Sequence, residues 1–152
     1  KKFFKYNKKI NILVFSDLHN IKSYNKFLIS LKYNKNVNYF FRPHPKNIKY
    51  YQNFFSKNSF NNLCLDVIND YKKSITKNKI NFIITSSYTG VLNEVSNMYW
   101  PILVLNFKNQ MPNININKYF EKNFIISNFQ NIKFKKYYSM SMRNKFIKFL
   151  NI

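Results

Sequence analysis

The stretch from Ile80 to Glu94, INFIITSSYTGVLNE, decides the fold that we predict for this chain. Its apolar run stops at Thr85-Ser86-Ser87, and apolar residues at helical spacing follow Gly90. The pattern predicts a strand, a polar turn and a helix. In an open parallel sheet such a turn lies at the carboxyl edge, where ligands bind, and the N–H groups that open the helix favour an anionic group such as phosphate. The same residues are also typical of an ordinary hydroxyl-rich N-cap.

Length and composition limit the class of protein. With 152 residues the chain is predicted to be a single domain, 1–152, large enough to bury a core. Its one cysteine, Cys64, excludes a disulfide framework and suits a reducing compartment. No apolar run approaches the roughly 20 residues of a membrane span. We therefore expect a cytoplasmic domain, with at most a peripheral association at the inner face of the cell membrane.

The formal net charge of +21 predicts salt-sensitive attraction to nucleic acid or anionic lipid. Such attraction need not be the function, because the lysines are scattered and only Arg42 and Arg143 are arginines. The densest basic segment, Lys133 to Lys148, also carries apolar residues at helical spacing. It predicts a C-terminal helix that packs on the sheet with a solvated lysine face, and the alternative is a nucleic-acid arm. A basic module that binds nucleic acid or anionic membrane is accordingly the second hypothesis for the function. We expect weak association with anionic membrane and no specific nucleic acid partner.

Apolar runs alternate with helical patterns along the whole chain. Strands are predicted at residues 11–15, 37–41, 62–68, 80–84 and 102–107, and helices at 21–31, 46–57, 70–77 and from 91 onward. Continuous runs of Val, Ile, Leu and Phe separated by helices indicate a parallel sheet that is covered on both faces. The prediction is an α/β fold, a doubly wound, Rossmann-like parallel sheet of about five strands with helices on both faces.

This topology gathers polar residues at one edge of the sheet. The residues that follow the first, second, fourth and fifth strands are, in that order, Asp17 and His19, His44, Ser86 and Ser87, and Lys108. If the strand order is 3-2-1-4-5, the first and fourth strands flank the switch point where such domains bind nucleotides. The two prolines beside His44 hold its imidazole on a stiff turn.

Two other motif interpretations use part of this cluster. Ser16-Asp17-Leu18-His19 resembles the opening motif of metallophosphoesterases, but the chain has one glycine and two histidines, too few for the remaining metal-binding motifs. Asp17, Thr85 or Ser86, and Lys108 loosely resemble a response-regulator receiver, with Asp66 or Asp70 as phosphoacceptor. With Gly90 as the sole glycine, no glycine-rich dinucleotide motif or P-loop can form. No metal site is predicted.

The interpretation that uses the most residues rests on a family resemblance. The segments Arg42-Pro43-His44-Pro45, Thr85 to Glu94 and Pro101 to Leu105 resemble, in order and spacing, the nucleotide-binding half of bacterial glycosyltransferases with the two-domain B-type fold. The similarity covers roughly residues 11–126. It is strongest to enzymes of surface polysaccharide biosynthesis, including sialyltransferases with His-Pro and Ser-Ser motifs and the glycerophosphate polymerases of teichoic acid synthesis.

The resemblance implies roles for individual residues. His44 would contact the donor phosphate as the catalytic residue, Ser86 and Ser87 would bind that phosphate, and Glu94 would hold the ribose hydroxyls. The predicted donor-binding residues are Asp17, Arg42, Thr85, Ser86, Ser87, Thr89, Gly90 and Glu94. Alternatively, His44 is a turn histidine bonded to nearby backbone and Glu94 a solvated helix carboxylate. The donor would be a nucleotide-activated sugar or a CDP-alcohol, with no further cofactor.

Enzymes of this kind also have an N-terminal domain that binds the acceptor and usually supplies the catalytic base. The present chain opens almost directly into its first strand, and nothing in it matches that domain. We expect the C-terminal half of a longer protein, or half of a split enzyme, whose carbohydrate or lipid-linked acceptor is bound by the missing half.

Overall fold

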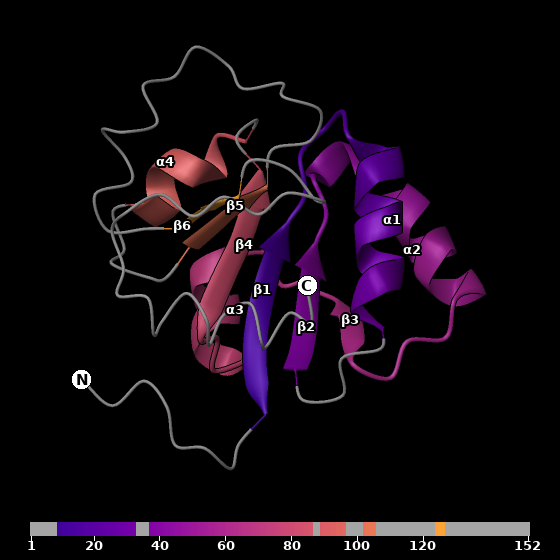
Figure 1. Cartoon of the computed structure of the whole chain (residues 1–152), viewed down its shortest axis with the longest axis horizontal. Helices are drawn as coiled ribbons and strands as arrows, with labels where there is room; N and C mark the ends of the chain where they lie inside the picture. The colour runs from indigo at the N-terminus through magenta and orange to yellow at the C-terminus, as the bar shows by residue number, and fades with distance from the viewer. Residues whose placement is uncertain (1–8, 33–36, 87–88, 97–101, 106–123, 127–152) are drawn as a thin grey trace.

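Strands and helices alternate in the computed structural model, which describes residues 9–32, 37–86, 89–96, 102–105 and 124–126 (Figure 1). The strands are β1 (Ile10–Phe15), β2 (Val37–Arg42), β3 (Leu63–Leu65), β4 (Phe82–Ser86), β5 (Ile102–Leu105) and β6 (Phe124–Ile126). The helices are α1 (Ile21–Leu31), α2 (Ile48–Lys57), α3 (Tyr71–Lys77) and α4 (Val91–Ser96), with a short 3₁₀ helix, η1 (Pro45–Asn47), directly before α2.

The strands form one sheet in the order β3-β2-β1-β4-β5-β6, and every pair of neighbours is parallel. The first strand, β1, therefore lies inside the sheet; β2 and β3 follow on one side of it, and the chain then crosses back to place β4 on the other side. The carboxyl ends of β1 and β4 flank the point where this direction reverses, which is where open parallel sheets usually bind ligands.

Side chains of β1 alternate between two hydrophobic cores because successive residues of a strand point to opposite faces. Ile12 and Val14 pack in a core with residues of α1 and α2. Leu13 and Phe15 pack in a second core with residues of α3 and α4. Figure 1 shows α1 and α2 together on one side of the sheet, beside β2 and β3. We refer to α1 and α2 as the first helix layer and to α3 and α4 as the second.

The prediction of an α/β fold with a parallel sheet is confirmed. The order assumed for the first five strands is also the observed order, and β6 is an addition that the sequence pattern did not predict. The third strand is shorter than predicted, because only residues 63–65 pair with β2. The predicted C-terminal helix, Lys133 to Lys148, lies outside the described residues, as does the end of the predicted fifth strand, 106–107.

The assignment of Thr85 and Ser86 to a turn is wrong. Both residues belong to β4, where they pair with Val104 and Leu105 of β5, and both are buried. Pairing with β5 extends the strand beyond its apolar run, so the turn begins only after Ser86. Among the described residues, no helix combines the length and the apolar character needed to cross a membrane.

Candidate functional site

A cavity of about 530 Å³ lies at the carboxyl ends of β1 and β2. Its lining comes from both helix layers: residues of η1 and α2 on one side, and the first residues of α3 and α4 on the other. The loop after β3 forms a further wall. The lining residues are Phe15, Ser16, Arg42, Pro43, His44, Pro45, Ile48, Gln52, Asp66, Val67, Ile68, Asn69, Tyr71, Thr89, Val91 and Glu94.

Four of the predicted site residues line this cavity: Arg42, His44, Thr89 and Glu94. The structure therefore brings together Arg42 and Glu94, which are 52 positions apart in the chain. Their roles in binding are a separate matter, and depend on which hydrogen bonds each side chain already makes.

Asp17 is buried and makes four hydrogen bonds through its carboxylate. Oδ1 accepts from the backbone N–H groups of His19 (2.9 Å) and Asn20 (2.8 Å), and Oδ2 accepts from the Asn20 amide (2.8 Å) and the Ser86 hydroxyl (2.7 Å). Asp17 thereby fixes the loop before α1 to the end of β4. Both of its carboxylate oxygens accept hydrogen bonds from other groups of the protein, and Asp17 is not among the cavity-lining residues.

Two buried phenols, Tyr24 and Tyr51, belong to the core that α1 and α2 share. The Tyr24 hydroxyl donates to the carbonyl oxygen of Phe15 (2.9 Å). Burial raises the pKa of Tyr24 well above its ordinary value, and the nearby Asp17 charge raises it further. Burial, followed by the charges of Tyr50 and Asp17, also raises the pKa of Tyr51. Both phenols therefore stay neutral and serve the core.

His44 stands directly after β2 and is fixed at two points. Its backbone N–H donates to the hydroxyl of Ser16 at 2.9 Å, which joins the turn to the end of β1. Its ring Nδ1 accepts from the backbone N–H of Lys46 at 3.3 Å, so the side chain caps η1. In a neutral imidazole whose Nδ1 is an acceptor, the proton is on Nε2. His44 thus carries one N–H donor that its capping role does not use.

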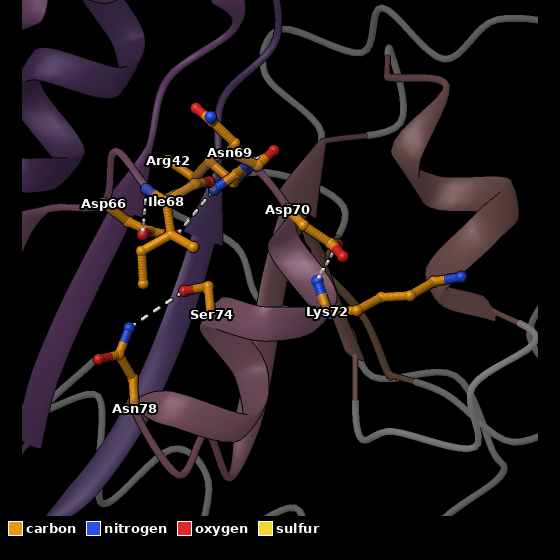
Figure 2. Close-up of polar contacts among 8 residues, drawn as sticks. All are labelled: Arg42, Asp66, Ile68, Asn69, Asp70, Lys72, Ser74 and Asn78. Carbon is orange, nitrogen blue, oxygen red and sulfur yellow. Dashed lines mark hydrogen bonds and ion pairs between the residues drawn. The ribbon is translucent and has the colours of Figure 1, made fainter.

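Arg42 is a clamp on the loop between β3 and α3. Its Nη1 forms an ion pair with Asp66 at 3.1 Å and also donates to the carbonyl oxygen of Ile68, and its Nη2 donates to the carbonyl oxygen of Asn69 at 2.9 Å. Figure 2 shows the guanidinium of Arg42 reaching into this loop. The Asp66 side chain is 1% exposed, so the pair is nearly enclosed. Arg42 lines the cavity, but its guanidinium mainly holds the loop between β3 and α3 in place.

The clamped loop is braced at both ends by carboxylates. Asp66 also accepts from the backbone N–H of Ile68 at 3.2 Å, and Asp70 caps α3 by accepting from the backbone N–H of Lys72 at 2.9 Å (Figure 2). With its backbone held in this way, the loop exposes Val67, which is 61% exposed, beside the cavity. The wall is therefore a preorganised surface with an apolar side chain.

Glu94 and Tyr71 meet across the two short helices of the second layer. The Tyr71 hydroxyl donates to Oε2 of Glu94 at 2.8 Å, and both residues line the cavity. The Arg42 and Asp66 charges neutralise one another, so Glu94 is the remaining formal charge among the described lining residues. The cavity accordingly has a hydrogen-bond donor at His44 and an acceptor at Glu94, contributed from opposite helix layers.

The start of α4 is less open to an anion than the sequence indicated. The hydroxyl of Thr89 accepts from the backbone N–H of Val91 at 3.3 Å, so one N–H of the first turn already has a partner. Among the described residues, no heavy atom lies within 4 Å of the position that a Cβ at Gly90 would occupy, and Gly90 does not adopt a positive φ. The conformation described here thus does not itself require a glycine at position 90.

Of the remaining predicted site residues, Asp17, Thr85, Ser86 and Gly90 are described by the structure and are not among the cavity-lining residues. Thr85 and Ser86 are buried in β4, with Ser86 bonded to Asp17. Ser87 and Lys108 lie outside the described residues. Sequence reasoning missed Tyr71, Ser16 and the loop after β3. A tyrosine at the start of a predicted helix, directly after a capping Asp70, was the available signal for Tyr71.

The geometry gives little support to the two other motif interpretations. Asp66 is enclosed in an ion pair and Asp70 caps a helix, so both candidate phosphoacceptors of a receiver are engaged. The Asp17 oxygens are filled by protein donors. Within the described ranges, no three residues of the metal-binding types His, Cys, Asp and Glu come together in a way that could hold a metal ion.

Comparisons with known proteins add no assignment to this geometry. No protein-family model matches the chain, and no curated protein matches it significantly.

Proposed function

We propose that the chain is a doubly wound, Rossmann-like donor-binding domain of a glycosyltransferase or glycerophosphotransferase of bacterial surface polysaccharide biosynthesis. It would hold a nucleotide-activated sugar or a CDP-alcohol in the cavity at the carboxyl edge of the sheet. A second domain would bind the carbohydrate or lipid-linked acceptor and supply the catalytic base.

The observation that carries the proposal is the placement of His44 and Glu94 in one cavity, on opposite helix layers. A nucleoside phosphate has an anionic end that needs donors and a ribose end whose hydroxyls need acceptors. The Nε2–H of His44 suits the phosphate, and the Glu94 carboxylate suits the ribose. A volume of about 530 Å³ also falls in the usual range for small-molecule sites.

In transfer, the bond between the sugar and the donor phosphate breaks and its electron pair stays on the phosphate oxygen. A donor already fixed beside that oxygen stabilises the charge that develops there. His44 meets this requirement, because its ring is held by the Lys46 N–H and its backbone by Ser16. The acceptor hydroxyl would lose its proton to a base of the acceptor domain.

The direct test measures binding of cytidine and uridine nucleotides to the chain by amide chemical shifts. His44→Ala should weaken binding by about 1 to 3 kcal/mol, the value of one hydrogen bond to a charged group, with little loss of stability. His44→Asn separates capping from binding, because asparagine is a good N-cap but has no Nε2–H. We expect Asn to preserve η1 without restoring affinity.

His19→Ala is the matched control, because His19 is the other histidine, is exposed and does not line the cavity. It should bind nucleotides as the wild type does. Shift changes confined to lysine-rich segments, with Thr89 to Glu94 unmoved, would contradict the proposal. So would equal losses in the His19 and His44 variants.

Gly90→Ala offers an independent check on the same site. Its backbone conformation and the free space around its Cβ position predict unchanged or slightly higher stability, by at most about 1 kcal/mol. If the donor phosphate approaches the backbone at the start of α4, the added methyl group should still weaken nucleotide binding. A variant that binds normally would place the phosphate away from Gly90.

A second function, binding of nucleic acid or anionic membrane, is favoured by one observation. Lys72, Lys73 and Lys77 of α3 are exposed and border a shallow surface depression together with Thr76. This surface would attract any polyanion, and its affinity should follow salt concentration. Binding that is selective for one sequence or one lipid, and that persists at moderate salt, would favour this function over the first.

A further inference from the structure

The contact between Tyr71 and Glu94 links the first turn of α3 to the first turn of α4. The hydrogen bond measures 2.8 Å from the phenol oxygen to Oε2. The Tyr71 ring is itself located by Phe15, against which it packs edge to face with ring centroids 5.7 Å apart. Phe15 is buried at the end of β1, so the phenol is anchored to the central strand of the sheet.

The Tyr71 hydroxyl keeps its proton, and so remains a donor, at neutral and moderately alkaline pH. Burial raises its pKa to about 12, and the hydrogen bond to Glu94, the Glu94 charge and the Asp70 charge act in the same direction. Glu94 itself is exposed. Without a partner, an exposed glutamate side chain samples many rotamers, and binding a ligand must then restrict it.

We propose that Tyr71 is a positioning residue, which holds the Glu94 carboxylate as a fixed acceptor for a vicinal diol and so makes the cavity select ribonucleotides over 2′-deoxyribonucleotides. The inference deepens the proposed function and rests on it. With Tyr71 on Oε2, the carboxylate is oriented before the ligand arrives. A ribose offers two hydroxyl donors to it, and a deoxyribose offers one.

The geometry favours a diol over a phosphate at this end of the cavity. A phosphate beside Glu94 would meet a like charge, and the cationic group among the described lining residues, Arg42, is already bonded to Asp66 and to the loop. A pair of hydroxyl groups, in contrast, supplies hydrogen-bond donors to the Glu94 carboxylate. The hydrogen bond from Tyr71 fixes the orientation of that carboxylate. The anionic end of the ligand is then directed to His44.

The experiment compares the dissociation constants of cytidine 5′-monophosphate and its 2′-deoxy analogue for the whole chain. For the wild type we expect a preference for the ribonucleotide of about tenfold, the value of a hydrogen bond to a charged group. Tyr71→Phe keeps the ring and removes the donor, and should reduce the preference to about twofold. Glu94→Asp shortens the side chain that carries the acceptor and leaves Tyr71 unchanged. It should reduce the preference for the ribonucleotide by the same amount.

Tyr50→Phe is the control, because Tyr50 is also partly exposed and helical but does not line the cavity. It should keep the wild-type preference. Equal weakening of both nucleotides by Tyr71→Phe, with the preference intact, would show a merely structural role and overturn the inference while leaving the proposed function in place. Wild-type binding of both nucleotides with equal affinity would do the same. Binding of neither would overturn the proposed function and the inference together.

Discussion

At the scale of single residues, Asp17 shows how a polar group at the edge of a sheet can serve the fold instead of a ligand. Its two oxygens accept four hydrogen bonds, three from the loop that leads into α1 and one from the end of β4. The side chain therefore stabilises the loop against which the turn of His44 packs. Removing it leaves the buried Ser86 hydroxyl and three partly buried N–H donors without their acceptor.

Asp17→Ala should lower the free energy of unfolding by about 3 kcal/mol, because it removes four hydrogen bonds at once and one of them, to Ser86, is buried. Urea denaturation followed by circular dichroism measures the change. Asp70→Ala is the control: the Asp70 carboxylate makes one exposed capping bond, and its loss should cost only about 1 kcal/mol. Equal costs for the two variants would contradict a buried network at Asp17.

Tyr71 makes a second prediction at this scale, for alkaline pH. Its pKa is about 12 in the folded protein and ordinarily 10.0. As the pH rises from 10 towards 12, the unfolded chain loses this proton first, so the stability that is fully present below pH 10 declines. Tyr24 and Tyr51 contribute in the same direction. The difference between wild type and Tyr71→Phe isolates one phenol.

The measurement is the midpoint of urea denaturation at several values of pH. We expect the gap between wild type and Tyr71→Phe to be largest near neutral pH and to narrow as the pH rises above 10. A gap that stays constant to the alkaline end would mean that Tyr71 titrates alike in the folded and unfolded chains.

At the scale of elements, the loop between β3 and α3 depends on Arg42, which reaches it from the neighbouring strand. Arg42→Met should cost about 3 kcal/mol, because it leaves the enclosed Asp66 carboxylate unpaired. Adding Asp66→Asn removes that stranded charge and keeps an acceptor for the Ile68 N–H. The double variant should therefore be more stable than Arg42→Met alone, by about 1 kcal/mol.

Arg42→Lys is the matched control for charge. A lysine can still pair with Asp66 but lacks the forked donors that reach the carbonyl oxygens of Ile68 and Asn69. It should fall between wild type and Arg42→Met in denaturation experiments. If all three proteins unfold at the same urea concentration, the ion pair contributes nothing measurable and the loop is held by its own backbone.

The elements were predictable from sequence where the signal is local. Apolar runs and helical spacing placed β1, β2 and α1 almost to the residue, because each run is bounded by polar residues nearby. The partner of Arg42 was not predictable, because Asp66 lies 24 positions away and its approach depends on how β3 pairs with β2. The same holds for Thr85 and Ser86, whose inclusion in β4 follows from pairing with β5.

The residues of the candidate site also differ in how far the sequence alone could predict them. His44 was recognisable because two prolines and a preceding strand fix its place in any parallel sheet. For Tyr71 the sequence offered only its place at the start of a predicted helix; its bond to Glu94, 23 positions away, exists only once α3 and α4 are packed on the same face. Side chains that hold other side chains leave no periodic pattern in a sequence.

At the scale of the whole molecule, charge is the dominant property. The chain has 26 basic residues and five acidic ones. Asp17, Asp66, Asp70 and Glu94, the acidic residues that the structure describes, bond to backbone, amide, hydroxyl or arginine groups, and the one ion pair reported in the described residues uses Arg42. The surface lysines thus gain little compensation from these carboxylates, and their mutual repulsion opposes the compact state.

Salt should consequently act in opposite directions on stability and on polyanion binding. Raising salt from about 50 mM to about 200 mM screens the lysines from one another, so the melting temperature should rise. Over the same range, affinity for duplex DNA or anionic vesicles should fall steeply, by about a thousandfold if six or more phosphates are contacted.

Binding of a nucleoside monophosphate in the cavity involves one phosphate near His44 and should fall by only a few fold. Scanning calorimetry, a DNA titration and a nucleotide titration on the same samples compare the three slopes. A nucleotide affinity that declines as steeply as the DNA affinity would mean that the nucleotide binds to scattered lysines. The cavity would then not be the nucleotide-binding site.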